Sequence, residues 1–194
     1  MKIPFNSNSV RLTSPYGKRT INGATDNHKG YDLVGVGSSE VTAVVGGTVA
    51  SSQIITDKSN LTWQWGNYVT VKGDDGNYYY YCHLASRAVN KGQKINAGDK
   101  IGVMGATGYV FGAHLHFEVR KSDGKTAISP EIVTGIPNKV GTHTNTVDNR
   151  SQLEKDIDVL VKHKIISTPE YWEQNANKMK YLPELIHNMA EAIR

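Results

Sequence analysis

The sequence has very little cysteine: Cys82 is the single cysteine among 194 residues. One cysteine excludes an intramolecular disulfide and a cysteine-based zinc finger. Cys82 follows a run of four tyrosines, so we expect it to be a small apolar residue of a β-strand.

Long hydrophobic runs are also missing. No stretch approaches the roughly 20 apolar residues that span a membrane, and the opening residues MKIPFNSNSVRLTS lack the apolar run of a secretory signal. We therefore expect a soluble protein without membrane insertion. Three routes to an extracellular site stay open: a leader absent from this sequence, release by lysis, or transport on a phage particle.

The sequence has only a small excess of positive charge, with a net charge of +4. The Lys and Arg residues are scattered, so the sequence predicts no nucleic-acid partner, although the excess suits an anionic polymer. Hydrophobic residues make up 38% and charged residues 21%, which favours a globular chain. Nineteen glycines indicate many tight turns and a β-rich fold.

The local patterns predict short strands up to about residue 120. Residues 32–50 combine valines with glycine pairs, and residues 65–84 read as a hairpin around the turn GDDGN. Residues 94–108 contain another short strand, and residues 114–120 alternate as a strand. We therefore predict a mainly antiparallel β domain over residues 1–135.

The remaining chain has a different texture. Residues 136–149 read as a linker, and residues 150–194 as a small three-helix module. Ser151 and Glu154 form a capping-box pattern, and Thr168 with Pro169 marks a second helix start. Two apolar stripes follow helical spacing: Leu153, Ile157, Leu160 and Val161, then Leu182, Leu185, Ile186, Met189 and Ile193. Three helices in about 45 residues form a marginal core alone, so we expect the module to pack on a neighbour or to dimerise.

Two histidines, His114 and His116, flank Leu115 in the segment GAHLHFE. Side chains two residues apart on a strand point to the same face, about 6.6 Å apart. Spacing alone leaves open whether they are metal ligands, a catalytic pair or polar residues of a half-buried strand. Leu115 points the other way and is expected in the core.

Three further residues could complete a site. His28 and Asp32 lie four apart, in what reads as a loop entering a strand, and both are zinc-ligand types. His83 ends the tyrosine-rich strand, where alternation places Tyr79 and Tyr81 on its face and Tyr80 and Cys82 on the other. Each feature also has a purely structural explanation: a polar turn before a strand for His28 and Asp32, and a strand-end histidine beside aromatic core residues for His83.

Together these segments resemble the lysostaphin-like zinc metallopeptidases of family M23. The likeness covers residues 12–120 and includes H-x-x-x-D, Y-x-H-L, a glycine-rich turn series and H-x-H-F-E. The resemblance implies an antiparallel β peptidase domain with an open groove. It implies one Zn²⁺ per chain, held by His28, Asp32 and His116, and it makes His83 and His114 catalytic residues.

The resemblance also implies an activity: hydrolysis of peptide bonds in bacterial peptidoglycan by metal-activated water. His83 and His114 would share the roles of base and oxyanion stabiliser. The helical module makes the chain similar to a phage or prophage lysin. Two alternatives are a non-catalytic binding or regulatory module and a structural phage tail component.

Several residues keep two readings. Tyr79 and Tyr81 either contact substrate or pack. Gly102, Gly105, Gly108 and Gly112 either keep a groove wall low or serve turns with positive φ. His143, His163 and His187 are expected on the surface.

Overall fold

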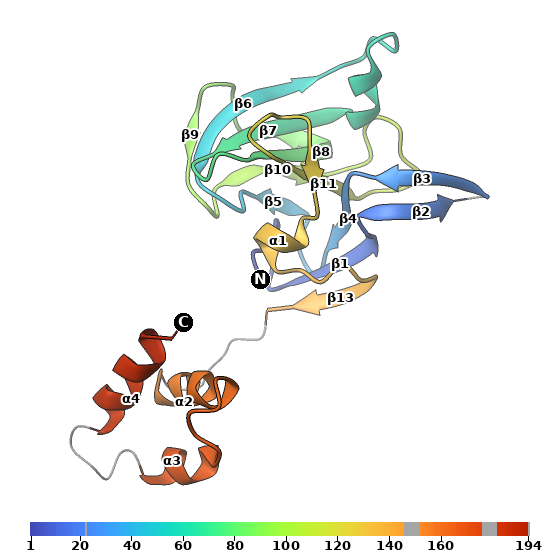
Figure 1. Cartoon of the computed structure of the whole chain (residues 1–194). Helices are drawn as coiled ribbons and strands as arrows, with labels where there is room; N and C mark the ends of the chain where they lie inside the picture. The colour runs from blue at the N-terminus through green and yellow to red at the C-terminus, as the bar shows by residue number, and fades with distance from the viewer. Residues whose placement is uncertain (22, 146–151, 176–181, 194) are drawn as a thin grey trace. The chain divides into compact units, whose positions relative to one another are not determined.

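The chain separates into two compact units, Met1–Asn145 and Thr146–Arg194. A computed structural model describes residues 1–21, 23–145, 152–175 and 182–193 (Figure 1). Each unit has a hydrophobic cluster of its own, and the first unit holds all five residues of the predicted site.

The first unit is built on antiparallel β-strands, as predicted. Its described residues form a sheet of 11 strands and a separate two-stranded sheet. The main path runs β13-β1-β4-β11-β8-β7-β6-β9; β10 pairs with β5 and β8, and β12 pairs with β11. The first strands are β1 (Ser9–Ser14), β2 (Gly17–Ile21), β3 (Ala24–His28), β4 (Gly30–Gly35), β5 (Glu40–Thr42) and β6 (Gly47–Ile54). The later ones are β7 (Asn67–Gly73), β8 (Tyr78–Arg87), β9 (Lys94–Ile95), β10 (Lys100–Met104), β11 (Leu115–Arg120), β12 (Ala127–Ile128) and β13 (Gly141–Thr144).

Strand β11 lies in the middle of this path, between β4 and β8. Its alternation sends Leu115, Phe117 and Val119 into the core, where none of the three is exposed. Burying one such side chain contributes about 1.5–3 kcal/mol. The opposite face of β11 carries His116 and Glu118, so the strand that anchors the core also presents the site. The predicted core position of Leu115 is confirmed.

The predicted hairpin is also present. β7 and β8 pair antiparallel from Asn67 opposite Leu84 to Lys72 opposite Tyr78. Gly76, in the turn between them, has a φ of 86°, which glycine adopts without strain. A short 3₁₀ helix, η1 (Leu61–Trp65), precedes β7.

The boundary of the first unit lies further along the chain than predicted. Residues 136–145 belong to this unit and are not a linker: Ile136 is fully buried in its core, after a short helix α1 (Glu131–Thr134). β13 then pairs with β1 from Gly141 opposite Leu12 to Thr144 opposite Ser9. The sequence pattern did not predict this strand because the segment has few apolar residues. Strand pairing depends on backbone hydrogen bonds, which need no apolar side chain. His143 lies in β13.

Three helices make up the described part of the second unit: α2 (Gln152–Lys162), α3 (Pro169–Asn175) and α4 (Leu182–Glu191). Ile157, Leu160, Ile186 and Ala190 form its buried cluster. Thr168 stands directly before α3, at the predicted start. Ser151 and the side chain of Glu154 lie outside the described residues.

The predicted stripe of α4 is wrong at two positions. Leu185 and Met189 are exposed, and Ala190 takes a core position. His163 is exposed, and His187 is partly exposed while its Nδ1 lies 2.8 Å from the buried Asp156 of α2. Across the described residues, no helix is long and apolar enough to cross a membrane.

Candidate metal centre and catalytic histidines

Three neighbouring strands bring the predicted site residues together. In the ladder, His116 of β11 stands opposite Asp32 of β4 on one side and Cys82 of β8 on the other. Directly opposed residues of neighbouring strands present their side chains on one face. The sheet register therefore places residues from three distant parts of the sequence side by side.

His28 reaches the same place from a hairpin. It was expected in a loop, but it is the last residue of β3, which pairs with β2 and leads through Lys29 into β4. Its ring is buried, and its Nε2 lies 3.1 Å from Asp32 Oδ1 and 3.0 Å from His116 Nδ1. His116 Nδ1 lies 2.9 Å from the same carboxylate oxygen. These three atoms form a nearly equilateral triangle.

The other ring nitrogens show what the triangle can hold. His28 Nδ1 lies 2.8 Å from the carbonyl of Pro15, and His116 Nε2 lies 3.0 Å from Glu118 Oε1. A carbonyl or carboxylate oxygen only accepts, so these two nitrogens carry the hydrogens. In the neutral rings, three lone-pair atoms then converge on one point.

A cation satisfies that arrangement. Ligand atoms of a tetrahedral zinc ion, with bonds of about 2.0–2.1 Å, stand about 3.3 Å apart. The triangle needs to open by only a few tenths of an ångström to match. His28, Asp32 and His116 thus fit a zinc ion in donor type, number and spacing.

The electrostatics of the triangle favour positive charge. Burial raises the pKa of Asp32, but hydrogen bonds from His116 and His28 outweigh it and hold that pKa well below its usual range. Burial lowers the pKa of His116, yet Asp32 and Glu118 raise it to about 9. The two carboxylates that stabilise a proton at Nδ1 stabilise a metal cation in the same way.

His83 joins the centre through a β-bulge, which corrects the alternation predicted for β8. Asn67 pairs with Leu84 and Val69 with Tyr81, so Cys82 and His83 together face Tyr68. His83 has a φ of 64°, which is uncommon outside glycine. The extra residue turns its ring towards the site, with its centroid 4.8 Å from that of His114 and 5.7 Å from that of His116.

Tyr79 and Tyr81 consequently lie on the opposite face from His83. Both are fully buried beside Phe117 in the core. The hydroxyl of Tyr79 donates to Asp75, and that of Tyr81 accepts from the backbone N–H of Val44. Of the two readings of these tyrosines, the structure supports packing, and their suggested contact with substrate is wrong.

His83 and His114 are oriented by the same backbone segment. His83 Nδ1 lies 2.9 Å from the carbonyl of Thr107, and His114 Nδ1 lies 2.9 Å from that of Gly112. Both Nδ1 atoms therefore donate, and each neutral ring keeps Nε2 as its acceptor. His114 Nε2 lies 3.5 Å from Asp32 Oδ1. Burial, followed by repulsion from His116 and His114, lowers the pKa of His83 to about 3, so His83 is neutral at pH 7.

Two residues of the site were missed in the sequence. Glu118 bridges His116 and Arg120, whose Nη2 lies 2.6 Å from its second oxygen. Arg19 holds the outer oxygen of Asp32 at 3.0 Å and pairs with Asp26 at 2.9 Å. Strand alternation from His116 could have found Glu118, whereas Arg19 depends on the β2–β3 hairpin, which the sequence reading did not anticipate.

The glycines serve close backbone packing at three positions. A Cβ on Gly102 would lie 2.2 Å from Ser86 O, and one on Gly105 would lie 2.4 Å from Ala85 N. Gly108 has a φ of 84° and would meet Gln64 O at 2.3 Å, whereas Gly112 is open. Gly102 and Gly105 let β10 and the residue after it approach β8 closely. Gly108 lets the segment that orients the histidines pack against the backbone of η1.

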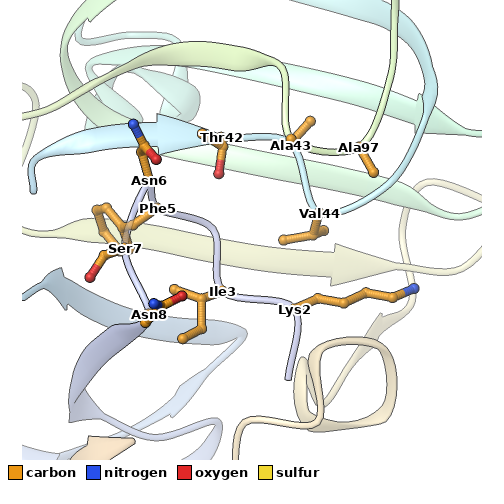
Figure 2. A pocket seen from close by; sticks show the side chains of 11 residues that line it. Lys2, Ile3, Phe5, Asn6, Ser7, Asn8, Thr42, Ala43, Val44 and Ala97 are labelled. Atoms are coloured by element: carbon orange, nitrogen blue, oxygen red, sulfur yellow. The ribbon is translucent and has the colours of Figure 1, made fainter. Parts of the chain in front are cut away.

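A cavity of about 590 Å³ lies apart from these histidines. Figure 2 shows Lys2, Ile3 and Phe5 along one wall and Thr42 to Val44 along another. Lys2 is the one ionisable residue in its lining, and none of the site residues takes part.

Comparison with known proteins identifies the class. The chain belongs to peptidase family M23, which it matches over residues 26–130. The peptidoglycan DD-endopeptidase ShyC of Vibrio cholerae is 32% identical over 111 residues, 56% of this chain and 24% of that protein. The murein hydrolase activator NlpD of Escherichia coli is 30% identical over 101 residues, 52% of this chain and 25% of that protein.

A solved structure agrees with the fold. The catalytic domain of the antimicrobial peptidase lysostaphin from Staphylococcus simulans is 28% identical, with a TM-score of 0.51 over 67% of this chain and 93% of that domain. This likeness confirms the lysostaphin-like β fold. The chain spans between 13% and 30% of the length of the first curated relatives it matches.

Proposed function

We propose that this chain is a zinc-dependent endopeptidase that hydrolyses peptide bonds in bacterial peptidoglycan. The observation that carries the proposal is the convergence of His28 Nε2, Asp32 Oδ1 and His116 Nδ1 within 2.9–3.1 Å of one another. Two oriented histidines stand directly beside this triangle. These three residues would hold a zinc ion and, being only three, would leave it open to water or substrate, as catalytic zinc sites do.

Zinc bound at the triangle would supply a Lewis acid that polarises a peptide carbonyl and makes water more acidic. The chain's own residues supply the proton chemistry. His83 and His114 each keep an unprotonated Nε2 in the neutral ring, so either can take a proton from the attacking water. Once protonated, the same nitrogen donates a hydrogen bond to a developing oxyanion. We propose that the two histidines share these roles.

The substrate class is supported by relatives. ShyC is named a peptidoglycan DD-endopeptidase. The bond cut by this chain, in a stem peptide or a cross-bridge, is part of the proposal. We infer action at the cell wall, as a phage or prophage lysin, with the helical module binding wall, dimerising or docking on a larger assembly.

One relative favours a second candidate function. NlpD is named a murein hydrolase activator, which is a regulatory role. Under that reading the chain would bind a partner and cleave nothing. A complete ligand triangle with two neighbouring histidines supports the enzyme, because a binding module has no need of that arrangement.

Four matched variants test the proposal. His28→Ala and His116→Ala each remove a ligand, so the purified chain is expected to lose its zinc. His83→Ala and His114→Ala keep the triangle, so they are expected to hold about one zinc per chain while hydrolysis falls by about 10²–10⁴-fold. Metal content is measured by elemental analysis and hydrolysis by clearing of purified walls.

A chelator provides the control. Wild-type hydrolysis is expected to stop on chelation and to return when zinc is added. Zinc-loaded wild-type protein that leaves walls intact, and equally so after His114→Ala, would favour the activator reading.

A further inference from the structure

Three aromatic side chains form a row in the first unit, of which Tyr109 and Phe111 are exposed and Trp63 is half-buried. The ring centroids of Trp63 and Tyr109 are 6.0 Å apart, and those of Tyr109 and Phe111 are also 6.0 Å apart. Phe111 is 85% exposed and Tyr109 63% exposed. Leu61, at 78%, extends the exposed apolar surface of the η1 segment. Contiguous apolar surface on a soluble domain marks a binding site more often than scattered residues do.

The row is continuous with the catalytic histidines. It lies on two segments, residues 61–65 and 107–112, which are joined by a hydrogen bond of 2.9 Å from Tyr109 N to Gln64 O. The second segment also provides both carbonyls that orient the histidines: Thr107 O for His83 and Gly112 O for His114. A ligand lying on the row is thus held beside the reacting groups.

The chemistry of the two segments selects the ligand. They read LTWQW and TGYVFG and contain no charged residue. Their polar side-chain groups are all uncharged: the hydroxyls of Thr62, Thr107 and Tyr109, the amide of Gln64, and the indole N–H groups of the two tryptophans. A stem peptide brings carboxylates and amines, which such a surface cannot pair. A sugar ring brings apolar C–H faces, which pack on aromatic rings, and hydroxyls, which hydrogen-bond to amides and hydroxyls.

We propose that Trp63, Tyr109 and Phe111 bind the glycan strand of peptidoglycan and present its attached peptide to the histidines. This inference rests on the proposed function for its substrate class and adds the sugar polymer as the part recognised by the row. The row would hold the glycan strand outside the metal centre. Lys58, whose Nζ lies 5.5 Å from the centroid of the Trp63 ring, helps to fix the position of that ring.

The test uses the full chain and glycan strands from which an amidase has removed every stem peptide. Such strands contain no peptide bond, so binding is measured without cleavage. Binding is followed by calorimetry and by tryptophan fluorescence, since Trp63 lies in the row. Phe111→Ala and Tyr109→Ala are each expected to weaken binding about tenfold or more, because each removes a large apolar contact.

A matched control is Ile132→Ala, in helix α1, where Ile132 is 72% exposed but belongs to neither segment. It is expected to bind glycan strands like the wild type. Circular dichroism checks that all three variants stay folded, and the two aromatic variants test the row independently of each other.

Two results would overturn the inference. One is a wild-type chain that does not bind peptide-free glycan, or that binds it equally after both aromatic substitutions. The other is binding of sugar-free stem peptides that both substitutions weaken, which would make the row a peptide subsite. Failure to hydrolyse intact walls alongside normal glycan binding would instead count against the proposed function alone.

Discussion

At the scale of single residues, the centre depends on which nitrogen of each imidazole faces inward. His28 and His116 use different atoms, Nε2 and Nδ1, and each is held by an oxygen on its other nitrogen. Carboxylate partners of this kind orient ligand histidines and increase their basicity. Glu118 would therefore act on a metal held by the triangle through its hydrogen bond to His116.

Glu118→Gln tests this positioning role. The amide keeps the size of the side chain but removes the charge that holds His116 Nε2–H, so zinc affinity is expected to fall about 10–100-fold. Competition with a chromophoric chelator measures the affinity. Glu131→Gln, on α1 and exposed, is the matched control and should bind zinc like the wild type. Equal affinity in both variants would show that Glu118 serves only its ion pair with Arg120.

At the scale of elements, the bulge in β8 and the segment after β10 decide where His83 points. Thr107 joins them: its hydroxyl accepts from Asn67 N at 2.9 Å and donates to Leu84 O at 2.8 Å, while its carbonyl holds His83. One side chain thus ties β7 and β8 to the segment that orients both histidines.

Thr107→Val keeps the shape of this side chain and removes both hydroxyl bonds. It leaves a donor and an acceptor of the backbone without their partner, so the free energy of unfolding is expected to fall by about 1–3 kcal/mol. Thr107→Ser retains the hydroxyl and should lose less. Urea unfolding of the two variants measures the difference, and equal losses would mean that the hydroxyl bonds contribute nothing.

The same elements show what sequence reasoning could reach. Period-two alternation correctly placed Leu115 in the core and His116 on the opposite face. It failed at His83, because one extra residue in β8 reverses every assignment across the bulge. It also missed the β2–β3 hairpin, whose short polar strands carry little apolar pattern, and with it Arg19. The division of roles between His114 and His116 came from family resemblance, since spacing alone treats them alike.

At the scale of the whole molecule, composition and texture predicted a β domain followed by helices, and both are present in the described residues. The boundary was misplaced because β13 is an edge strand with few apolar residues. Each unit buries its own cluster, of Tyr31, Phe117 and their neighbours in the first and of Ile157 and Ile186 in the second.

Separate cores predict that residues 1–145 fold alone. This fragment should unfold cooperatively and bind zinc within about twofold of the full chain, because every ligand and its supporting contacts lie inside it. Thermal unfolding and chelator competition compare the two chains. A fragment that is insoluble or unable to bind zinc would contradict the division into two independent units.

Mass spectrometry of digested peptidoglycan tests the central claim most directly. Zinc-loaded protein is expected to produce muropeptides with a newly formed amine and carboxylate at one peptide bond, and that bond identifies the specificity. His114→Ala should retain zinc and produce none. Unchanged muropeptides from zinc-loaded wild-type protein, or identical products from His114→Ala, would contradict the account of an endopeptidase acting through these histidines.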